Sequence, residues 1–210
     1  MAVIDRLHHE DPMALTKQAK TLNKNQIGAV LNYLANRRNA LRNQTIFLLS
    51  VKAGLRAKEI ACLRWEMVLD ADGSLSNELA LLDEASKGKS GRRIPLNKDV
   101  RRNLAELWVA HRRNRHFSPS DHVIRTERAD RTSPQAIVNM FSRWYGDLGL
   151  IGCSSHSGRR TFITNAAKKI TTVGGSLRDV QYLAGHSSLQ TTERYIEYSE
   201  QARRQIVDVI

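Results

Sequence analysis

Apolar residues recur at helical spacing over much of the chain. Ile27, Val30, Leu31 and Leu34 stand at i, i+3, i+4 and i+7, one face of a helix. Asn23, with Gln26 three positions later, is typical of a capping box at the start of that helix. The same pattern predicts six further helices. Two lie in the first third of the chain, at 42–53, where Gly54 ends the helix, and at 58–64. The third is capped by Asn97, the fourth runs from Ser133-Pro134 to Gly149, the fifth begins near His156 with Ser155 as its cap, and the sixth runs from the Ser176–Asp179 capping box to Gly185. Residues 188–197 and 199–209 are also predicted to be helical.

One block interrupts the helical pattern. Short segments at 66–70, 78–83 and 92–96 are separated by turn signals at 71–74 and 87–91. Short apolar runs between such turns are typical of hairpin strands. We therefore predict a mostly α fold with a small antiparallel β-sheet (α+β).

The charge balance narrows the partner. The 210 residues include 33 Lys and Arg against 21 Asp and Glu, a formal charge of +12. Such a surplus favours a polyanionic partner, nucleic acid before any other, although an anionic membrane surface would also attract it.

Several other classes are disfavoured. The longest apolar run, residues 46–49, is far shorter than the ~20 residues of a membrane span. The first twelve residues lack the apolar centre of a signal peptide. Cys62 and Cys153 form neither a CxxC pair nor a zinc cluster with histidines. We expect a cytoplasmic protein that uses no metal and no other cofactor.

Metal-free cleavage of a DNA phosphodiester needs fixed cations, a nucleophile, a proton acceptor and a donor to the leaving oxygen. Arg56, in AGLRAKE, follows the helix-ending glycine. Lys87 occupies the predicted hairpin tip, where it would suit a general acid, and Lys89 is its rival. Taken alone, each is more often only a solvated surface charge.

The C-terminal half supplies the remaining candidates. His156 and Arg159 are spaced i, i+3 near a predicted helix N-terminus, where anions are favoured. An isolated HxxR match is commonly accidental, and a histidine after glycine, like His186, often only binds a carbonyl. Tyr195 and Tyr198 are the two possible nucleophiles in this region.

The order of these signals along the chain is more informative than any one of them. GLRxxE, KGK in a hairpin, HxxR and LxGHxxxxTTxxY follow one another between residues 54 and 195. In this the chain resembles the tyrosine recombinase (phage integrase) family over roughly residues 22–200. The resemblance implies a catalytic set of Arg56, Lys87, His156, Arg159, His186 and Tyr195. Tyr195 is favoured over Tyr198 because it stands nine residues after the histidine and follows TT-x-x.

The resemblance also implies a mechanism. The two arginines of the set would clamp the scissile phosphate, and the two histidines would complete the cradle. Tyr195 would attack phosphorus to form a 3′-phosphotyrosyl bond while Lys87 protonates the departing 5′ oxygen. A free 5′ hydroxyl then reverses the step, so strand exchange needs neither ATP nor metal.

The sequence departs from the family pattern in several places. Gly158 and Arg160 stand where the family more often has Leu and His, and neither is expected to act directly. Many members of the family have a separate helical core-binding domain before the catalytic domain. Only 55 residues precede Arg56, too few for a full domain of that kind, so we expect either a naturally short recombinase or a fragment. We expect a partly ordered lead-in at 1–21, a catalytic domain at 22–198, and a helix at 199–210 that docks on a neighbouring protomer or folds back.

The implied partners are double-stranded DNA, further copies of the chain in a tetramer, and an accessory DNA-bending or directionality protein. Two other functions remain open: a non-catalytic DNA-binding regulator and a relaxing enzyme like the type IB topoisomerases. Candidate phosphate contacts, each equally compatible with a solvated surface role, are Arg101, Arg102, Arg112, Arg113, Arg115, Lys168 and Lys169.

Overall fold

A computed structural model describes residues 18–85, 91–113, 116–127, 129–196 and 207. The helices are α1 (Lys24–Ala35), α2 (Ala40–Ala53), α3 (Ala57–Ala61), α4 (Lys98–Arg112), α5 (Pro134–Asp147), α6 (Ser157–Lys169), α7 (Leu177–Ala184) and α8 (Leu189–Glu193). Short 3-10 helices are η2 (Trp65–Met67), η3 (Asp83–Ala85) and η4 (Ile170–Val173). The strands are β1 (Glu78–Leu81) and β2 (Arg92–Pro95).

Local capping signals place most helix ends where the sequence predicts them. The Asn23 side chain accepts from the N–H of Gln26, and Gln26 accepts from the N–H of Asn23 in return. Gly54 ends α2 and Gly185 ends α7, both in the left-handed region at φ 69° and 59°. A residue with a Cβ is strained there, so glycine at these two positions terminates the helix.

The sheet is smaller than predicted. β1 and β2 pair antiparallel, from Glu78 opposite Pro95 to Leu81 opposite Arg92. The expectation of a strand at 66–70 is wrong. Its first residues belong to η2, and Leu69 makes only an isolated bridge to Leu75.

The reason lies in the buried Trp65 that begins this turn. Its indole is fully buried, packs against Trp108 and Phe117, and donates to Nδ1 of His111 at 3.1 Å. These partners come from α4 and the loop after it, 43 to 52 positions later in the chain. A tertiary aromatic cluster therefore overrides the local strand pattern.

Three helix predictions need correction. α3 ends at Ala61 rather than 64, and α8 ends at Glu193 rather than 197. α6 begins at Ser157, and Ser154 rather than Ser155 bonds at its start, donating its N–H to Ser157 and accepting from that of His156. The predicted helix at 199–209 and residues 1–17 lie outside the described part of the chain, apart from Val207.

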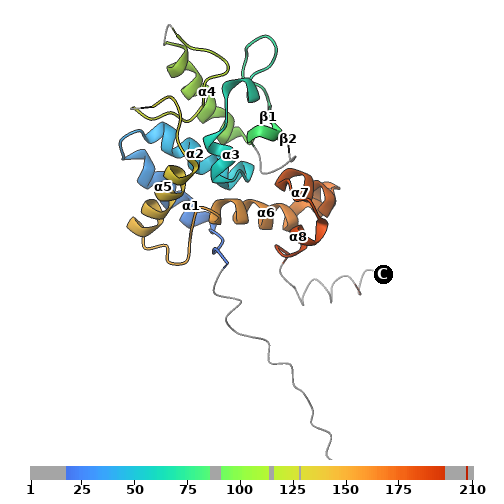
Figure 1. Ribbon diagram of the computed structural model, residues 1–210. Helices are drawn as coiled ribbons and strands as arrows, with labels where there is room; N and C mark the ends of the chain where they lie inside the picture. Colours follow the sequence, from blue (N-terminus) through green and yellow to red (C-terminus); the bar gives the residue numbers. More distant parts are fainter. Residues whose placement is uncertain (1–17, 86–90, 114–115, 128, 197–206, 208–210) are drawn as a thin grey trace, which may run out of the picture.

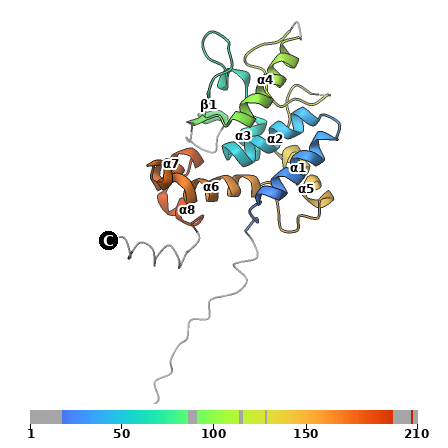
Figure 2. The same cartoon turned by 180° about the vertical axis from the view of Figure 1, so that it is seen from behind.

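The helices pack in two groups. α2 is the central element and contacts α1, α4 and α6, while α5 covers α3 (Figure 1). α7 and α8 pack on each other beside α6 and β2, and Figure 2 shows the same grouping from behind. A second, smaller apolar cluster of Ile163, Val180 and Ala184 holds this group, and Tyr195 packs against it. None of the described helices is both long and apolar enough to cross a membrane.

Candidate active site

One cavity of about 450 Å³ lies where the two groups of helices meet. Five of the six predicted catalytic residues line it, and they come from four separate segments of the chain: Arg56, His156, Arg159, His186 and Tyr195. The sixth, Lys87, lies outside the described residues, as do its rival Lys89 and the alternative nucleophile Tyr198. The cavity thus brings together catalytic candidates that are up to 139 positions apart.

Arg56 enters the cavity from the residue that precedes α3. Its backbone N–H donates to Oε2 of Glu59 at 2.8 Å, and its Nη1 donates to Oε1 of the same carboxylate at 2.8 Å. Nη2 reaches the carbonyl of Gly185 at 3.4 Å. The start of α3 and the end of α7 together therefore orient this guanidinium.

Glu59 is fully buried and is shared with a second arginine. Arg92, at the start of β2, donates to both carboxylate oxygens at 3.1 and 3.3 Å, and its Nε donates to the carbonyl of Leu183 at 2.8 Å. Burial opposes ionisation of Glu59, but Arg92 and Arg56 outweigh it and keep its pKa below the ordinary value. The carboxylate is therefore charged at neutral pH and ties β2 to the cavity wall.

Arg159 is the most enclosed cation of the set, with 5% of its surface exposed. It donates to the carbonyl of Gly54 at 2.6 Å and to that of Ala184 at 2.5 Å. Burial, with the charge of Arg56, lowers the pKa of Arg159 to about 10, so it stays protonated at pH 7. It joins the ends of α2 and α7, both of which terminate at a left-handed glycine.

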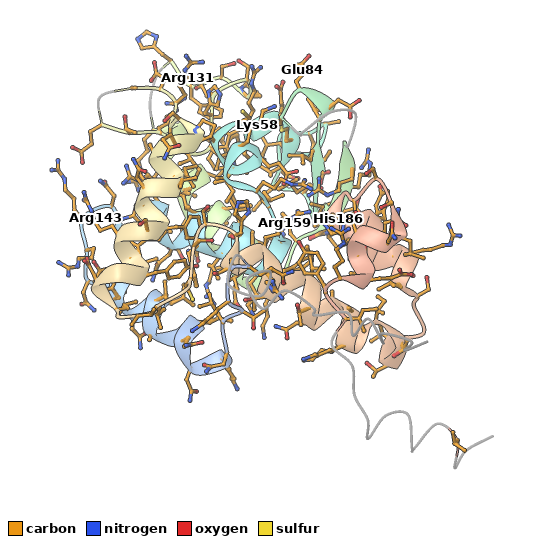
Figure 3. The ribbon with its side chains drawn as sticks, turned by 60° about the horizontal axis from the view of Figure 1, so that its bottom comes forward. Lys58, Glu84, Arg131, Arg143, Arg159 and His186 are labelled. Carbon is orange, nitrogen blue, oxygen red and sulfur yellow. The ribbon has the colours of Figure 1, made fainter. Side chains whose placement is uncertain are left out.

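His186 lies beside Arg159 (Figure 3). Its Nδ1 is 2.9 Å from the hydroxyl of Thr192, and its ring stacks on that of Tyr195 at 5.5 Å between centroids. Burial and the charges of Arg159, Arg56 and Arg92 lower the pKa of His186 to about 4. The imidazole is therefore neutral at pH 7 in the free protein.

Tyr195 stands in the turn just after α8, not within a longer helix as predicted. Its N–H donates to the carbonyl of Thr192 at 3.0 Å. The Arg160 guanidinium lies 5.9 Å from the centre of the phenol ring and also bonds Gln18. Arg160 was expected to have no direct role, but the structure places it in the cavity wall against the candidate nucleophile.

The cavity is an anion site by composition. Four arginines line it, Arg56, Arg159, Arg160 and Arg194, and its described lining contains no carboxylate. Planar guanidinium groups bind phosphate oxygens through paired hydrogen bonds. His156 is exposed and adds an imidazole to the same wall. Its backbone N–H donates to the Ser154 hydroxyl just before α6 begins. The arrangement suits a phosphodiester next to a phenol.

The sequence alone does not identify three residues that lie in or around this site: Glu59, Arg92 and Thr192. Glu59 belongs to the GLRxxE string, but nothing local shows that it is buried between two arginines. Arg92 reads as one of two arginines on a small strand, and Thr192 as part of a helix turn. Only their tertiary partners give these residues a role.

Comparison with known proteins identifies the family. The model of the phage integrase family matches residues 20–202. The chain belongs to the phage integrase family. The resemblance drawn from GLRxxE, HxxR and the final tyrosine motif is thereby confirmed.

Curated relatives carry recombinase names. The chain is 30% identical over 199 residues to tyrosine recombinase XerC of Actinobacillus pleuropneumoniae serotype 7, covering 94% of this chain and 60% of that protein. It is also 30% identical over 179 residues to tyrosine recombinase XerA of Thermococcus onnurineus, covering 84% of this chain and 57% of that one. The chain thus spans about 60% of the length of these relatives.

Solved structures of a transposon integrase and a site-specific recombinase share the fold. The Tn1549 transposon integrase in complex with a circular intermediate DNA superposes with a TM-score of 0.73 at 16% identity, covering 92% of this chain and 67% of that one. The XerH recombinase bound to palindromic difH superposes at 0.69 with 20% identity, covering 90% and 52%. The mostly helical fold with a small antiparallel sheet is confirmed.

Proposed function

We propose that this chain is the catalytic part of a site-specific DNA recombinase, which cleaves and rejoins strands through a 3′-phosphotyrosyl bond at Tyr195. The observation that carries the proposal is the gathering of Arg56, His156, Arg159, His186 and Tyr195 around one cationic cavity. The recombinase names of the relatives support the same reading.

Each residue has a role that its surroundings suit. Arg56 and Arg159, oriented by Glu59 and by backbone carbonyls, would hold two oxygens of the scissile phosphate and stabilise the charge that grows on them. His156 would accept the phenol proton as Tyr195 attacks phosphorus. His186 would donate to a phosphate oxygen. The leaving 5′ oxygen needs a proton, which we assign to Lys87.

The partners follow from the chemistry. Duplex DNA is the substrate class, and cleavage in a tetramer would supply the second strand for exchange. An accessory DNA-bending or directionality protein would act on the assembled complex, and the setting would be the cytoplasm, at the nucleoid. Solved relatives of this fold were crystallised with DNA, as with XerH on difH, which supports DNA as the partner.

Basic residues outside the cavity are less directly linked to this function. Arg101, Arg102 and Arg112 lie on α4, on the opposite side of the molecule from α8 in Figure 1, and Arg113 directly follows that helix. Lys168 and Lys169 lie at the end of α6. Arg115 lies outside the described residues. Phosphate contacts by these residues stay a prediction.

Covalent trapping tests the nucleophile. Nicked DNA duplexes built on repeats that flank the gene would be incubated with protein, and adducts that resist denaturant counted. We expect Tyr195→Phe to abolish adducts while Tyr198→Phe and Tyr182→Phe retain them. Tyr182 is the matched control because its phenol is exposed and accepts from the Arg93 N–H on β2.

The alternatives predict different results. Loss of adducts in Tyr198→Phe alone would contradict the choice of Tyr195. Tight binding to these repeats without any adduct would favour a DNA-binding regulator. Supercoil relaxation without strand exchange would favour a type IB-like relaxing enzyme.

A sulfur substitution tests the general acid. With a 5′-bridging phosphorothiolate, the departing thiolate needs no proton. We expect Lys87→Ala to cleave ordinary DNA poorly and the phosphorothiolate at the wild-type rate, while Lys89→Ala cleaves both normally. The reverse pattern would assign the role to Lys89.

A further inference from the structure

Thr192 makes a contact that the catalytic set leaves unexplained. Its side chain is completely buried, and its Oγ1 lies 2.9 Å from Nδ1 of His186. Between a hydroxyl and an imidazole nitrogen, either atom can be the donor. The direction of this hydrogen bond decides which nitrogen of His186 carries the proton when the ring is neutral.

The burial of Thr192 fixes that direction. A buried O–H needs an acceptor, because a buried donor that makes no hydrogen bond keeps the full cost of losing its water. Within the described part of the chain, His186 Nδ1 is the one hydrogen-bond partner of this hydroxyl. If Nδ1 donated instead, the O–H of Thr192 would be left without an acceptor. The hydroxyl therefore donates to Nδ1, and the proton of the ring lies on Nε2.

Thr192 also holds the candidate nucleophile. Its carbonyl accepts the N–H of Tyr195 at 3.0 Å, and the His186 and Tyr195 rings lie nearly parallel, 24° apart. One buried residue thus bonds the imidazole through its side chain and the phenol-bearing turn through its backbone. A shift of Thr192 would displace both groups in the cavity wall.

We propose that Thr192 is a positioning residue whose hydroxyl locks His186 in the Nε2–H tautomer, so that a neutral imidazole offers a hydrogen-bond donor to the phosphate. The phosphate part of this inference rests on the proposed function, whereas the tautomer does not. The low pKa of His186 supports it, since a neutral ring donates from only one nitrogen. Without Thr192 the other tautomer would present a lone pair to an anion.

Nitrogen NMR of histidine-labelled protein reads the tautomer directly. Protonated and unprotonated ring nitrogens have well-separated ¹⁵N shifts, and His186→Gln identifies the His186 signals among the seven histidines. We expect wild type and Thr192→Ser to show a proton on Nε2 alone. Thr192→Val, which keeps the shape but lacks the hydroxyl, should show a mixture of both tautomers.

A matched control separates this effect from a general loss of packing. Thr45 is also fully buried, and its hydroxyl donates to the Leu41 carbonyl within α2, away from the cavity. Thr45→Val should leave the His186 tautomer unchanged. A proton on Nδ1 in wild type, or an unchanged tautomer in Thr192→Val, would overturn the proposal.

Cleavage supplies a second readout. On nicked DNA we expect Thr192→Val to form adducts about tenfold more slowly, the size of one lost orienting hydrogen bond, and Thr192→Ser to restore most of the rate. The effect of Thr192→Val should largely disappear in a His186→Gln background, and equal effects in both backgrounds would overturn the proposal.

If wild type forms no adduct at all, the proposed function fails, and the NMR result still decides the tautomer. If Thr192→Val does not fold, the tautomer of wild type and of Thr192→Ser decides.

Discussion

The Arg92 guanidinium and the Glu59 carboxylate form an ion pair in which the two side chains are 1% and 0% exposed, although they are 33 positions apart in the sequence. Breaking one partner of such a pair leaves an uncompensated buried charge. Glu59 also orients Arg56, so this ion pair connects β2 to the cavity wall. β2 follows the segment that carries Lys87. Stability and catalytic geometry therefore depend on the same contact.

We expect Glu59→Gln to lower the free energy of unfolding by about 3–5 kcal/mol, measured by urea denaturation at pH 7. The pair Arg93–Glu78 is the matched control because its side chains are 72% and 45% exposed. Glu78→Gln should cost less than about 1 kcal/mol. Equal losses in the two variants would contradict the importance of burial here.

Acid should remove part of the same stabilisation. Burial raises the pKa of Glu59, but the two arginines outweigh it, so the folded-state pKa lies below its ordinary value. The contribution of Glu59 is therefore complete above its unfolded pKa of about 4.3 and is lost as pH falls through the lower folded value. Glu59→Gln should lack this component of acid unfolding, which denaturation midpoints measured from pH 7 to 3 would reveal.

The pKa of His186 should be near 4 in the free protein, read from its ring signals in an NMR titration. The folded value is below the unfolded one of about 6.5, so between these pH values only the unfolded chain binds the proton. This group therefore destabilises the fold as pH falls from 6.5 to 4. Arg56→Gln should raise the pKa of His186, because one nearby positive charge is removed.

The control for that shift is Arg93→Gln, an exposed arginine on β2 that is not among the charges acting on His186. It should leave the pKa of His186 unchanged. A phosphate that enters the cavity should raise this pKa, because the anion offsets the arginine charges. An unshifted pKa of about 6.5 in the free protein would contradict the electrostatic account.

Gly158 marks a close approach of α6 to α2. A Cβ at this position would lie 2.4 Å from the Ser50 hydroxyl and 3.0 Å from its Cβ. We expect Gly158→Ala to lower the free energy of unfolding by about 1–3 kcal/mol, and Ser50→Ala to recover part of that loss. Gly28→Ala in α1 should instead stabilise by about 0.5–1 kcal/mol, because an added Cβ there would meet nothing within 4 Å beyond its chain neighbours and its own helix backbone.

Arg160→Gln should weaken DNA binding and reduce the slope of log affinity against log salt by about 1, as measured by titrations at several salt concentrations. Adduct formation by Tyr195 should also slow, because the Arg160 guanidinium packs over the phenol ring in the same cavity wall and helps to hold the ring in place. Arg38→Gln is the control, because the exposed Arg38 pairs with Glu127 and does not line the cavity. The same change of slope in both variants would contradict a specific place for Arg160 at the cavity.

Much of the fold could be predicted because the signals are local. The Asn23–Gln26 and Ser176–Asp179 boxes act over three residues, and Gly54 and Gly185 end helices through their own left-handed backbone. These effects need no partner from elsewhere in the chain. The order of Arg56, HxxR, His186 and Tyr195 also survives in the sequence, because it follows chain order and not spatial position.

What the sequence by itself determined is therefore most of the helix boundaries and the identity of the candidate site residues. Tertiary structure alone decided that Trp65 begins a 3-10 turn, since its aromatic partners lie on α4 and the following loop. The tertiary structure also places the buried Glu59 against Arg56 and the buried Thr192 against His186, so that each positions a side chain of the cavity wall. Burial and hydrogen-bond direction depend on groups brought together from distant positions, so no local pattern of residues can specify them.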